Sequence, residues 1–281
     1  MKNSTLIVLT TAIVGAILGT GSAYAADLPV KAPVVVAPIP SWAGFYIGGN
    51  AGAGSAEGSF TLSPGGCFLT GACSTPALNP LRTFTEDNLN TFFVGGAQAG
   101  YNWQTGNFVY GLEGDINYNG WNNNTNIVYN LAAPLVGTFT DAVNTKLNWF
   151  GTVRGRIGVA ASPTIMIFAT GGLAYGQVSS STLGVFSAAG DTYASTASST
   201  RAGWTAGGGM EWMFLPNWSL KWEYLFIDLG KLNYTDRCVV ACGVFATPPA
   251  YATSVQFREQ VARVGINYHF NPPPAAVVAK Y

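Results

Sequence analysis

The chain has 281 residues and a formal net charge of zero; only 9% of its residues are charged, 13% are aromatic and 35 are glycine. A soluble domain usually carries about 25% charged residues, so the composition argues against a water-soluble globular protein. The near-neutral charge argues against nucleic acid as the main partner.

Residues 1–25 have the pattern of a signal peptide. Lys2 supplies a positive start, Leu6 to Leu18 is an apolar stretch, and the small residues around Tyr24 form a cleavage motif. A transmembrane anchor is the alternative, but the apolar stretch is shorter than the roughly 20 residues of a bilayer span. The predicted mature chain starts at Ala26 and loses one lysine, which leaves 12 basic and 13 acidic residues and a net charge of −1.

Beyond the signal no apolar run of about 18 residues remains, so no transmembrane helix is predicted. Residues 26–41 contain four prolines and are predicted to be an extended periplasmic arm. Between 42 and 270, long segments alternate apolar or aromatic residues with polar, charged or glycine residues, and this pattern occurs eight times. The predicted strands are 42–55, 91–103, 107–121, 145–161, 164–180, 199–213, 217–235 and 255–270.

The connections between these strands alternate in length. Long polar loops are predicted at 56–90, 122–144, 181–198 and 236–254, and short turns at 104–106, 162–163 and 214–216. This alternation is typical of an up-and-down barrel with long extracellular loops and short periplasmic turns. An even number of strands then leaves both ends of the barrel on the periplasmic side.

The face that carries the apolar residues indicates whether lipid or water surrounds the barrel. In the last segment Val264, Ile266 and Tyr268 share one face, while Arg263 and Asn267 share the other. An apolar outside with a polar inside fits a barrel surrounded by lipid, and a closed barrel satisfies every backbone group there. The predicted fold is therefore all-β, an eight-stranded up-and-down antiparallel transmembrane β-barrel.

The same phase places nine charged residues in the lumen. A barrel of eight strands is only wide enough for side chains to fill it. Paired carboxylates can perform acid–base catalysis, but opposite charges confined together more often form a structural ion-pair network. The predicted network consists of Glu113, Asp115, Arg154, Arg156, Glu211, Lys221, Glu223, Glu259 and Arg263.

Aromatic residues collect near the predicted strand ends, as interfacial girdles require. The general preference of strands for aromatic residues is the alternative explanation. The predicted girdle residues are Trp42, Trp103, Tyr110, Trp121, Trp149, Trp212, Trp218 and Phe270.

All four cysteines lie in predicted loops, Cys67 and Cys73 in one and Cys238 and Cys242 in another. No histidine lies nearby, so disulfides are favoured over a metal site in an exported chain. We expect local pairing, Cys67 with Cys73 and Cys238 with Cys242. Strands one and eight are neighbours in a closed barrel, so crossed pairing remains open.

Nucleophilic catalysis is poorly supported, because a triad needs a positioned base. The single histidine, His269, lies at the predicted periplasmic end of the last strand. Lipid-modifying barrels have their sites at the outer leaflet, and the same position argues against a haem ligand. No catalytic residue, metal site or cofactor is predicted.

Several stretches resemble the small outer-membrane porin-family surface antigens of alphaproteobacteria. They are residues 25–33, 42–50, Trp149-Phe-Gly-Thr-Val-Arg-Gly-Arg-Ile-Gly158, 221–230 and 261–270, and the resemblance spans the predicted mature chain. It implies an OmpA-like barrel in the bacterial outer membrane, a structural or immunogenic surface role, and assembly by the insertion machinery. Members normally end at the closing strand, whereas here a proline-rich tail, 271–281, follows Phe270. The assembly signal is therefore either Tyr268 with Phe270, or Tyr281.

The leading hypothesis is a non-enzymatic outer-membrane protein that contributes to envelope integrity and presents loops at the surface. A narrow porin-like channel for small solutes is the second hypothesis, and a lipid-modifying enzyme is the third. The expected partners are outer-membrane lipid and lipopolysaccharide, the insertion machinery, and host or surface ligands at the loops.

Overall fold

In a computed structural model, the described residues are 41–64, 82–86, 91–131, 137–187, 190–241 and 250–270. They form nine strands: β1 Gly44–Pro64, β2 Arg82–Glu86, β3 Thr91–Thr105, β4 Phe108–Leu131, β5 Gly137–Ser162, β6 Ile165–Phe186, β7 Asp191–Leu215, β8 Trp218–Val240 and β9 Ala250–His269. No helix among these residues is long and apolar enough to cross a membrane. The predicted signal peptide, the arm up to Pro40 and the tail lie outside the described residues.

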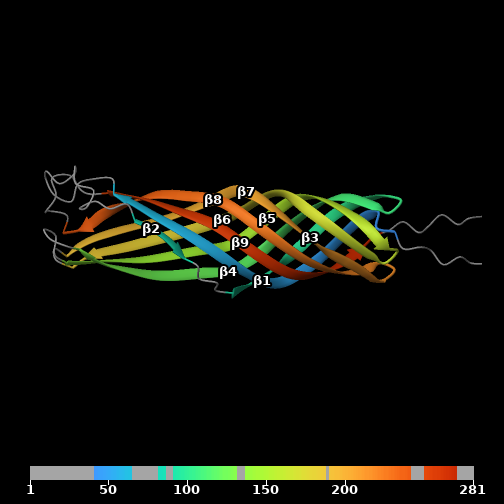
Figure 1. Ribbon diagram of the computed structural model, residues 1–281, viewed down its shortest axis with the longest axis horizontal. Coiled ribbons are helices and arrows are strands. Elements are labelled where there is room, and N and C mark those ends of the chain that lie inside the picture. The colour runs from blue at the N-terminus through green and yellow to red at the C-terminus, as the bar shows by residue number, and fades with distance from the viewer. Residues whose placement is uncertain are drawn as a thin grey trace, which may run out of the picture. The chain divides into compact units, whose positions relative to one another are not determined.

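The strands close into a barrel (Figure 1). From β3 to β9 each strand pairs antiparallel with the next, and β1 pairs with both β3 and β9. The short β2 pairs with Gly58–Leu62 of β1, on the edge that β3 occupies along Gly44–Ser55. The wall therefore has eight strand positions, which confirms the predicted fold.

Three tight turns gather at one end of the barrel. They lie at 106–107, 163–164 and 216–217, within two residues of the predicted turns. The barrel's first and last strands also meet here, because the backbone N–H of Phe270 donates to the carbonyl of Phe45 at 2.8 Å. We call this the turn end and the opposite end the loop end.

The strands are longer than predicted at the loop end. The predicted loop 122–144 is mostly strand, because β4 continues to Leu131 and β5 begins at Gly137. The predicted loop 181–198 is also mostly strand, since only four residues separate Phe186 from Asp191. The sequence predicts loops at these polar stretches because polar side chains face outward in this half of the barrel, whereas the exterior of the other half is apolar.

Two irregularities in pairing help to produce this reversal. Near the turn end of β8, Lys221 and Glu223 point into the lumen; beyond the bulge between Asp228 and Gly230, Leu232 points inward instead. Gly230 has a φ of 73°, a left-handed backbone that glycine adopts without steric cost. On β5 an irregularity between Leu147 and Phe150, in its pairing with β6, has the same effect. An added residue moves the following side chains to the other face of the strand.

The lumen has three layers. A small apolar cluster fills the turn end, a polar and charged layer follows, and a larger apolar cluster fills the loop-end half. Two predicted girdle residues belong to these clusters. Trp42 is fully buried beside His269, and Trp121 packs against Phe257 with ring centroids 5.6 Å apart. Both tryptophans have the same parity along the chain as the inward-facing residues beside them. This parity is a better guide to their orientation than their closeness to a strand end, on which the girdle prediction rests.

Candidate functional site

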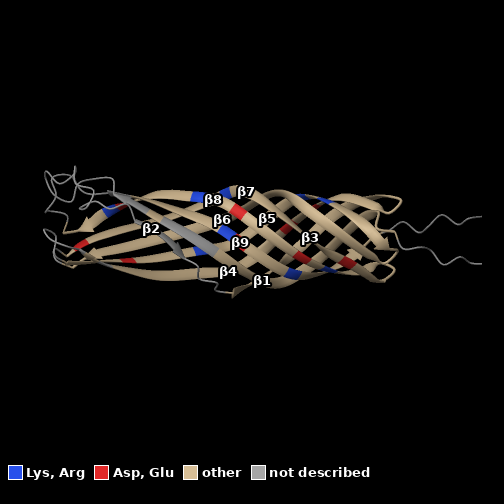
Figure 2. Ribbon diagram, viewed as in Figure 1, with Lys and Arg blue, Asp and Glu red and all other residues tan. Residues whose placement is uncertain are grey.

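The charged layer is built by five strands. β4, β5, β8 and β9 supply most of its charges and β7 supplies Glu211, and Figure 2 shows that other charged residues lie along the strands toward the loop end. Eight of the nine predicted lumen residues form ion pairs with one another inside the wall. They are Glu113, Asp115, Arg154, Arg156, Glu211, Lys221, Glu223 and Arg263.

Arg154 is the centre of the layer and its side chain is fully buried. Its guanidinium donates to Glu113, to Asp115 at 2.9 Å and to Glu223 at 2.7 Å. Arg263 donates to two of the same carboxylates, Asp115 at 2.7 Å and Glu223 at 2.6 Å. Each carboxylate is thus shared by two guanidinium groups, an arrangement of charge-assisted hydrogen bonds that holds four strands together.

The remaining two cations lie towards the turn end. The Lys221 ammonium lies 2.9 Å from both oxygens of Glu113. Arg156 donates to Glu211 at 2.7 Å and to the hydroxyl of Tyr46 at 2.9 Å, and its guanidinium also stacks over Phe168, 4.3 Å from the ring centroid. The tyrosine hydroxyl in turn donates to Glu113 at 2.6 Å.

Neutral polar side chains complete the layer; of these, only Asn267 was singled out from the sequence, as a residue of the polar face. Thr152 accepts from Arg154 and Asn117 accepts from Arg263. Gln98 donates to Asn267 at 2.6 Å, which donates to Glu211 at 2.7 Å. All four have the inward phase of the charged residues beside them, so the alternating pattern contained the signal that places them in the lumen.

The ninth predicted residue, Glu259, does not join the network. Its side chain is buried, but it forms no ion pair with the described residues, and its Oε2 accepts from Asn119 at 2.7 Å. It lines a small cavity with apolar neighbours including Ala56, Trp121 and Ile227. The phase was predicted correctly, but Glu259 lies nearer the loop end than any of the four cations, so it faces the apolar layer.

Glu211 also meets the single histidine. The hydroxyl of Ser219 donates to Glu211 at 2.6 Å and lies 2.9 Å from Nε2 of His269. A catalytic triad needs its carboxylate on the other ring nitrogen, whereas here Glu211 also lies on the Nε2 side, at 3.4 Å. Ser219 and His269 are both fully buried, so this corner has the geometry of a structural contact.

The layer balances its own charge. Four cations meet four carboxylates in the buried interior, and each cation has at least two acidic or polar partners. Buried charges are tolerated when they are paired and hydrogen-bonded in this way. Within the described residues no group of three or more His, Cys, Asp or Glu side chains could hold a metal ion. The arrangement is suited to blocking the lumen of the barrel.

Of the four cysteines, only Cys238 lies within the described residues, and it is disulfide-bonded. Cys67, Cys73 and Cys242 lie outside them. The local pairing therefore stays a prediction.

The chain is similar to known outer-membrane proteins over most of its length. The family model "Outer membrane protein beta-barrel domain" matches residues 16–272. A 31 kDa outer-membrane immunogenic protein of Brucella melitensis is 37% identical, and the match covers 89% of this chain and 94% of the relative. A 22 kDa outer membrane protein of Rhizobium leguminosarum bv. viciae is 31% identical over 75% of this chain and 72% of that protein.

Among solved structures, the outer membrane protein OprG from Pseudomonas aeruginosa aligns with 81% of this chain and 97% of its own, at 9% identity and a TM-score of 0.43. The family match and the identity to the Brucella and Rhizobium proteins confirm the predicted alphaproteobacterial resemblance. The chain belongs to the outer-membrane protein β-barrel family, and it is a protein of the bacterial outer membrane.

Proposed function

We propose that this protein is a non-enzymatic structural barrel of the outer membrane that contributes to envelope integrity and carries surface-exposed segments. The observation that supports the proposal most directly is the charged layer. Arg154 joins β5 to Glu223 on β8, and Arg263 joins β9 to Asp115 on β4, each across the lumen at 2.7 Å. Side chains so joined leave no room for a hydrated solute to pass.

The two apolar layers support the same function. Trp42 and Met166 are fully buried at the turn end. Phe139, Phe150 and Leu225 are fully buried in the loop-end half. A solute channel requires a continuous polar path, whereas here the polar layer is enclosed between two packed clusters. The narrow porin-like channel is therefore the less favoured function.

The function of a lipid-modifying enzyme is disfavoured because a lipid substrate has no access to the candidate catalytic residues. Ser219 and His269 are the best nucleophile and base that the described residues bring together, and both are fully buried near the turn end. A lipid substrate would have to enter the packed lumen to meet them. No reaction is therefore proposed for this corner.

The loop end is assigned to the cell surface because the long connections lie there. The Brucella relatives are named immunogenic, which supports surface presentation for this chain too. Host or other surface ligands would meet these connections. At the turn end, Tyr268 and Phe270 meet edge to face with ring centroids 4.9 Å apart. We assign to these rings the signal that the insertion machinery recognises.

Conductance in a planar lipid bilayer tests the proposal. The purified wild type should give little or no steady current, whereas Arg154→Ala combined with Arg156→Ala should increase leak currents by opening the layer. Arg258→Ala serves as the matched control, because this arginine lies on the exterior with a side chain 48% exposed. Large, stable currents from the wild type would overturn the proposal and favour the channel.

A further inference from the structure

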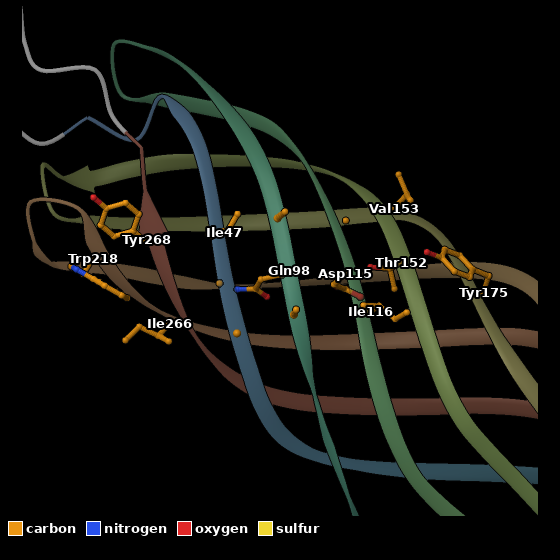
Figure 3. A pocket seen from close by; sticks show the side chains of 15 residues that line it. Ile47, Gln98, Asp115, Ile116, Thr152, Val153, Tyr175, Trp218, Ile266 and Tyr268 are labelled. Atoms are coloured by element: carbon orange, nitrogen blue, oxygen red, sulfur yellow. The ribbon is translucent and has the colours of Figure 1, made fainter.

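An apolar groove runs along the membrane-facing side of the wall. It has a volume of about 810 Å³ and is lined by residues of β1, β3, β4, β5, β6, β8 and β9. Figure 3 shows the lining from Trp218 and Tyr268, near the turn end, to Val153 and Tyr175. Gln98, Asp115 and Thr152 are buried behind it, on the lumen side of the same strands.

The groove has a floor of small residues between larger flanks. Gly49, Ala97, Ala99 and Gly114 form the floor, and the flanks include Ile116, which is 57% exposed. From β9 to β6 it crosses five strand spacings of about 4.8 Å, a length of about 24 Å. An acyl chain spans about half of a hydrocarbon core that is about 30 Å thick, so the groove is long enough to hold one.

The barrel itself does not require glycine on this floor. A Cβ added to Gly49 or to Gly114 would have its nearest neighbour at 3.7 Å, an ordinary contact distance. The inward-facing glycines differ, since a Cβ on Gly48 would lie 2.1 Å from Asn267 and one on Gly96 would lie 2.0 Å from a backbone oxygen. The inward-facing glycines are required because the neighbouring strand leaves no room for a side chain. The outward-facing glycines of the groove floor have room for one, so glycine there keeps open a space that a ligand outside the barrel can occupy.

The side chains change character beyond the loop-end side of the groove. Tyr175 contacts Trp149, with ring centroids 6.0 Å apart, and the indole N–H donates to Gln177 at 3.2 Å. Lys146 follows on β5, paired in register with Ser179. The step from Tyr175 to Ser179 is four residues, or about 13 Å of strand. The wall thus presents an apolar groove, then amphipathic rings, then a cation.

Lys146 differs from the other charged residues of the neighbouring strands in facing outward. Within the described residues of β4, β5 and β6, every other charged side chain points into the lumen, so Lys146 is the single charge on their outer face. It is exposed, and the described residues offer it no ion pair. A cation above an apolar groove matches an anionic headgroup above an acyl chain, because cations near a membrane surface attract anionic lipids.

We propose that this groove is a binding site for lipid A of lipopolysaccharide. One acyl chain lies along Gly49, Ala97 and Gly114, and a phosphate group lies at Lys146. Trp149 and Gln177 contact the polar sugar region between them. The site lies on the outside of the wall, so it does not depend on whether the lumen conducts, and bilayer conductance tests that question separately.

Native mass spectrometry of the full-length barrel, released from detergent and titrated with lipid A, tests the site. The wild type should retain one lipid A per barrel. Gly114→Leu and Ala99→Leu each fill the groove from a different strand, and both should weaken binding at least tenfold. Both side chains point outward, so either variant suffices if the other fails to fold. Lys146→Ala should weaken binding several-fold and remove the preference for lipid A over its dephosphorylated form.

Lys231→Ala is the matched control, since this exposed lysine lies at the loop end of β8, away from the groove lining. It should bind lipid A as the wild type does. Equal weakening by the two lysine variants would reduce the interaction to general charge attraction and overturn the proposal. Unchanged binding by both groove-filling variants would also overturn it. So would a wild-type dimer that these variants convert to monomers without loss of lipid A, because the groove would then receive a second copy of the chain.

Discussion

Arg154 on β5 donates to Glu223 on β8 at 2.7 Å, although the two strands lie three positions apart around the wall. The contact therefore crosses the lumen. Both side chains are almost completely buried, at 0% and 1% exposure. This ion pair links two strands that are not neighbours. Its removal should therefore lower the stability of the whole barrel and not only of one pair of strands.

Replacing Arg154 by methionine should therefore destabilise the barrel strongly. Glu113, Asp115 and Glu223 would each lose a buried partner, and breaking such a pair costs about 3–5 kcal/mol. Urea unfolding in lipid vesicles, followed by tryptophan fluorescence, measures the loss. Arg258→Met is the control and should change the free energy of unfolding by less than about 1 kcal/mol, because the Arg258 side chain is 48% exposed and its pair with Asp228 is open to solvent on that side. Equal effects of the two variants would contradict the stabilising role of the ion pair across the lumen.

Glu259 should respond in the opposite way to its neighbours. It has no cationic partner in the described part of the chain, and Asn119 donates to only one of its oxygens. Glu259→Gln keeps an acceptor for Asn119 and removes an unpaired acid, so the free energy of unfolding should stay within about 1 kcal/mol or increase. Glu223→Gln, the matched change inside the network, should lose about 3 kcal/mol. The same urea titration distinguishes them, and a large loss in Glu259→Gln would indicate a missing ionic partner.

The charged layer could be predicted from sequence because lipid on the outside requires the charges to face inward. Alternation then assigns Glu113, Arg154 and Arg263 to the lumen without further information. The height of each residue along the barrel axis is a different matter, because it depends on strand tilt and stagger. Alternation alone therefore grouped Glu259 with cations that lie nearer the turn end.

The strand extensions could not be predicted for a related reason. Beyond the apolar band the exterior meets water, so β4 and β7 carry asparagine, serine and threonine on faces that are apolar nearer the turn end. Such segments resemble loops in composition. The bulge at Gly230 adds one residue and reverses the phase of β8, and no local sequence signal distinguishes this glycine from the many others in the chain.

Gly230 should be sensitive to substitution although it lies outside the charged layer. Its φ of 73° is a left-handed conformation, which costs a non-glycine residue about 1–2 kcal/mol. Gly230→Ala should lower the free energy of unfolding by about this amount. Gly155→Ala is the control, because a Cβ there would meet only Gly171 O at 3.9 Å, and it should be neutral or slightly stabilising. A neutral Gly230→Ala would mean that the bulge relaxes.

The disulfide of Cys238 should join it to Cys242. Local pairing closes the shorter loop, and Cys67 and Cys73 would then pair with each other. Mass mapping of peptides from the unreduced protein identifies the partners directly. A peptide that links Cys238 to Cys67 or to Cys73 would establish crossed pairing between neighbouring loops instead. Reduction should leave the charged layer intact in either case, because the bridge lies at the loop end.

Asp236 should make the loop end sensitive to pH. It lies ten residues beyond Phe226 on β8, outside the apolar band, and it accepts a hydrogen bond from Thr253. Burial raises the pKa of Asp236 from 3.8 to about 6. The folded barrel thus favours the protonated acid, so this contribution to stability is complete below about pH 3.8 and is lost as the pH rises through 6.

Two pKa units correspond to about 2–3 kcal/mol. The full amount separates pH values below 3.8 from those above about 6. Between pH 5 and pH 8 the wild type should lose about 1.4 kcal/mol of it, because pH 5 lies one unit below the folded pKa. Asp236→Asn keeps the acceptor for Thr253 and cannot ionise, so it should flatten the profile between pH 4 and pH 7 and gain stability at pH 8. Urea midpoints measured at several pH values for both proteins provide the comparison. Parallel profiles would show that Asp236 ionises in the folded barrel as it does in water.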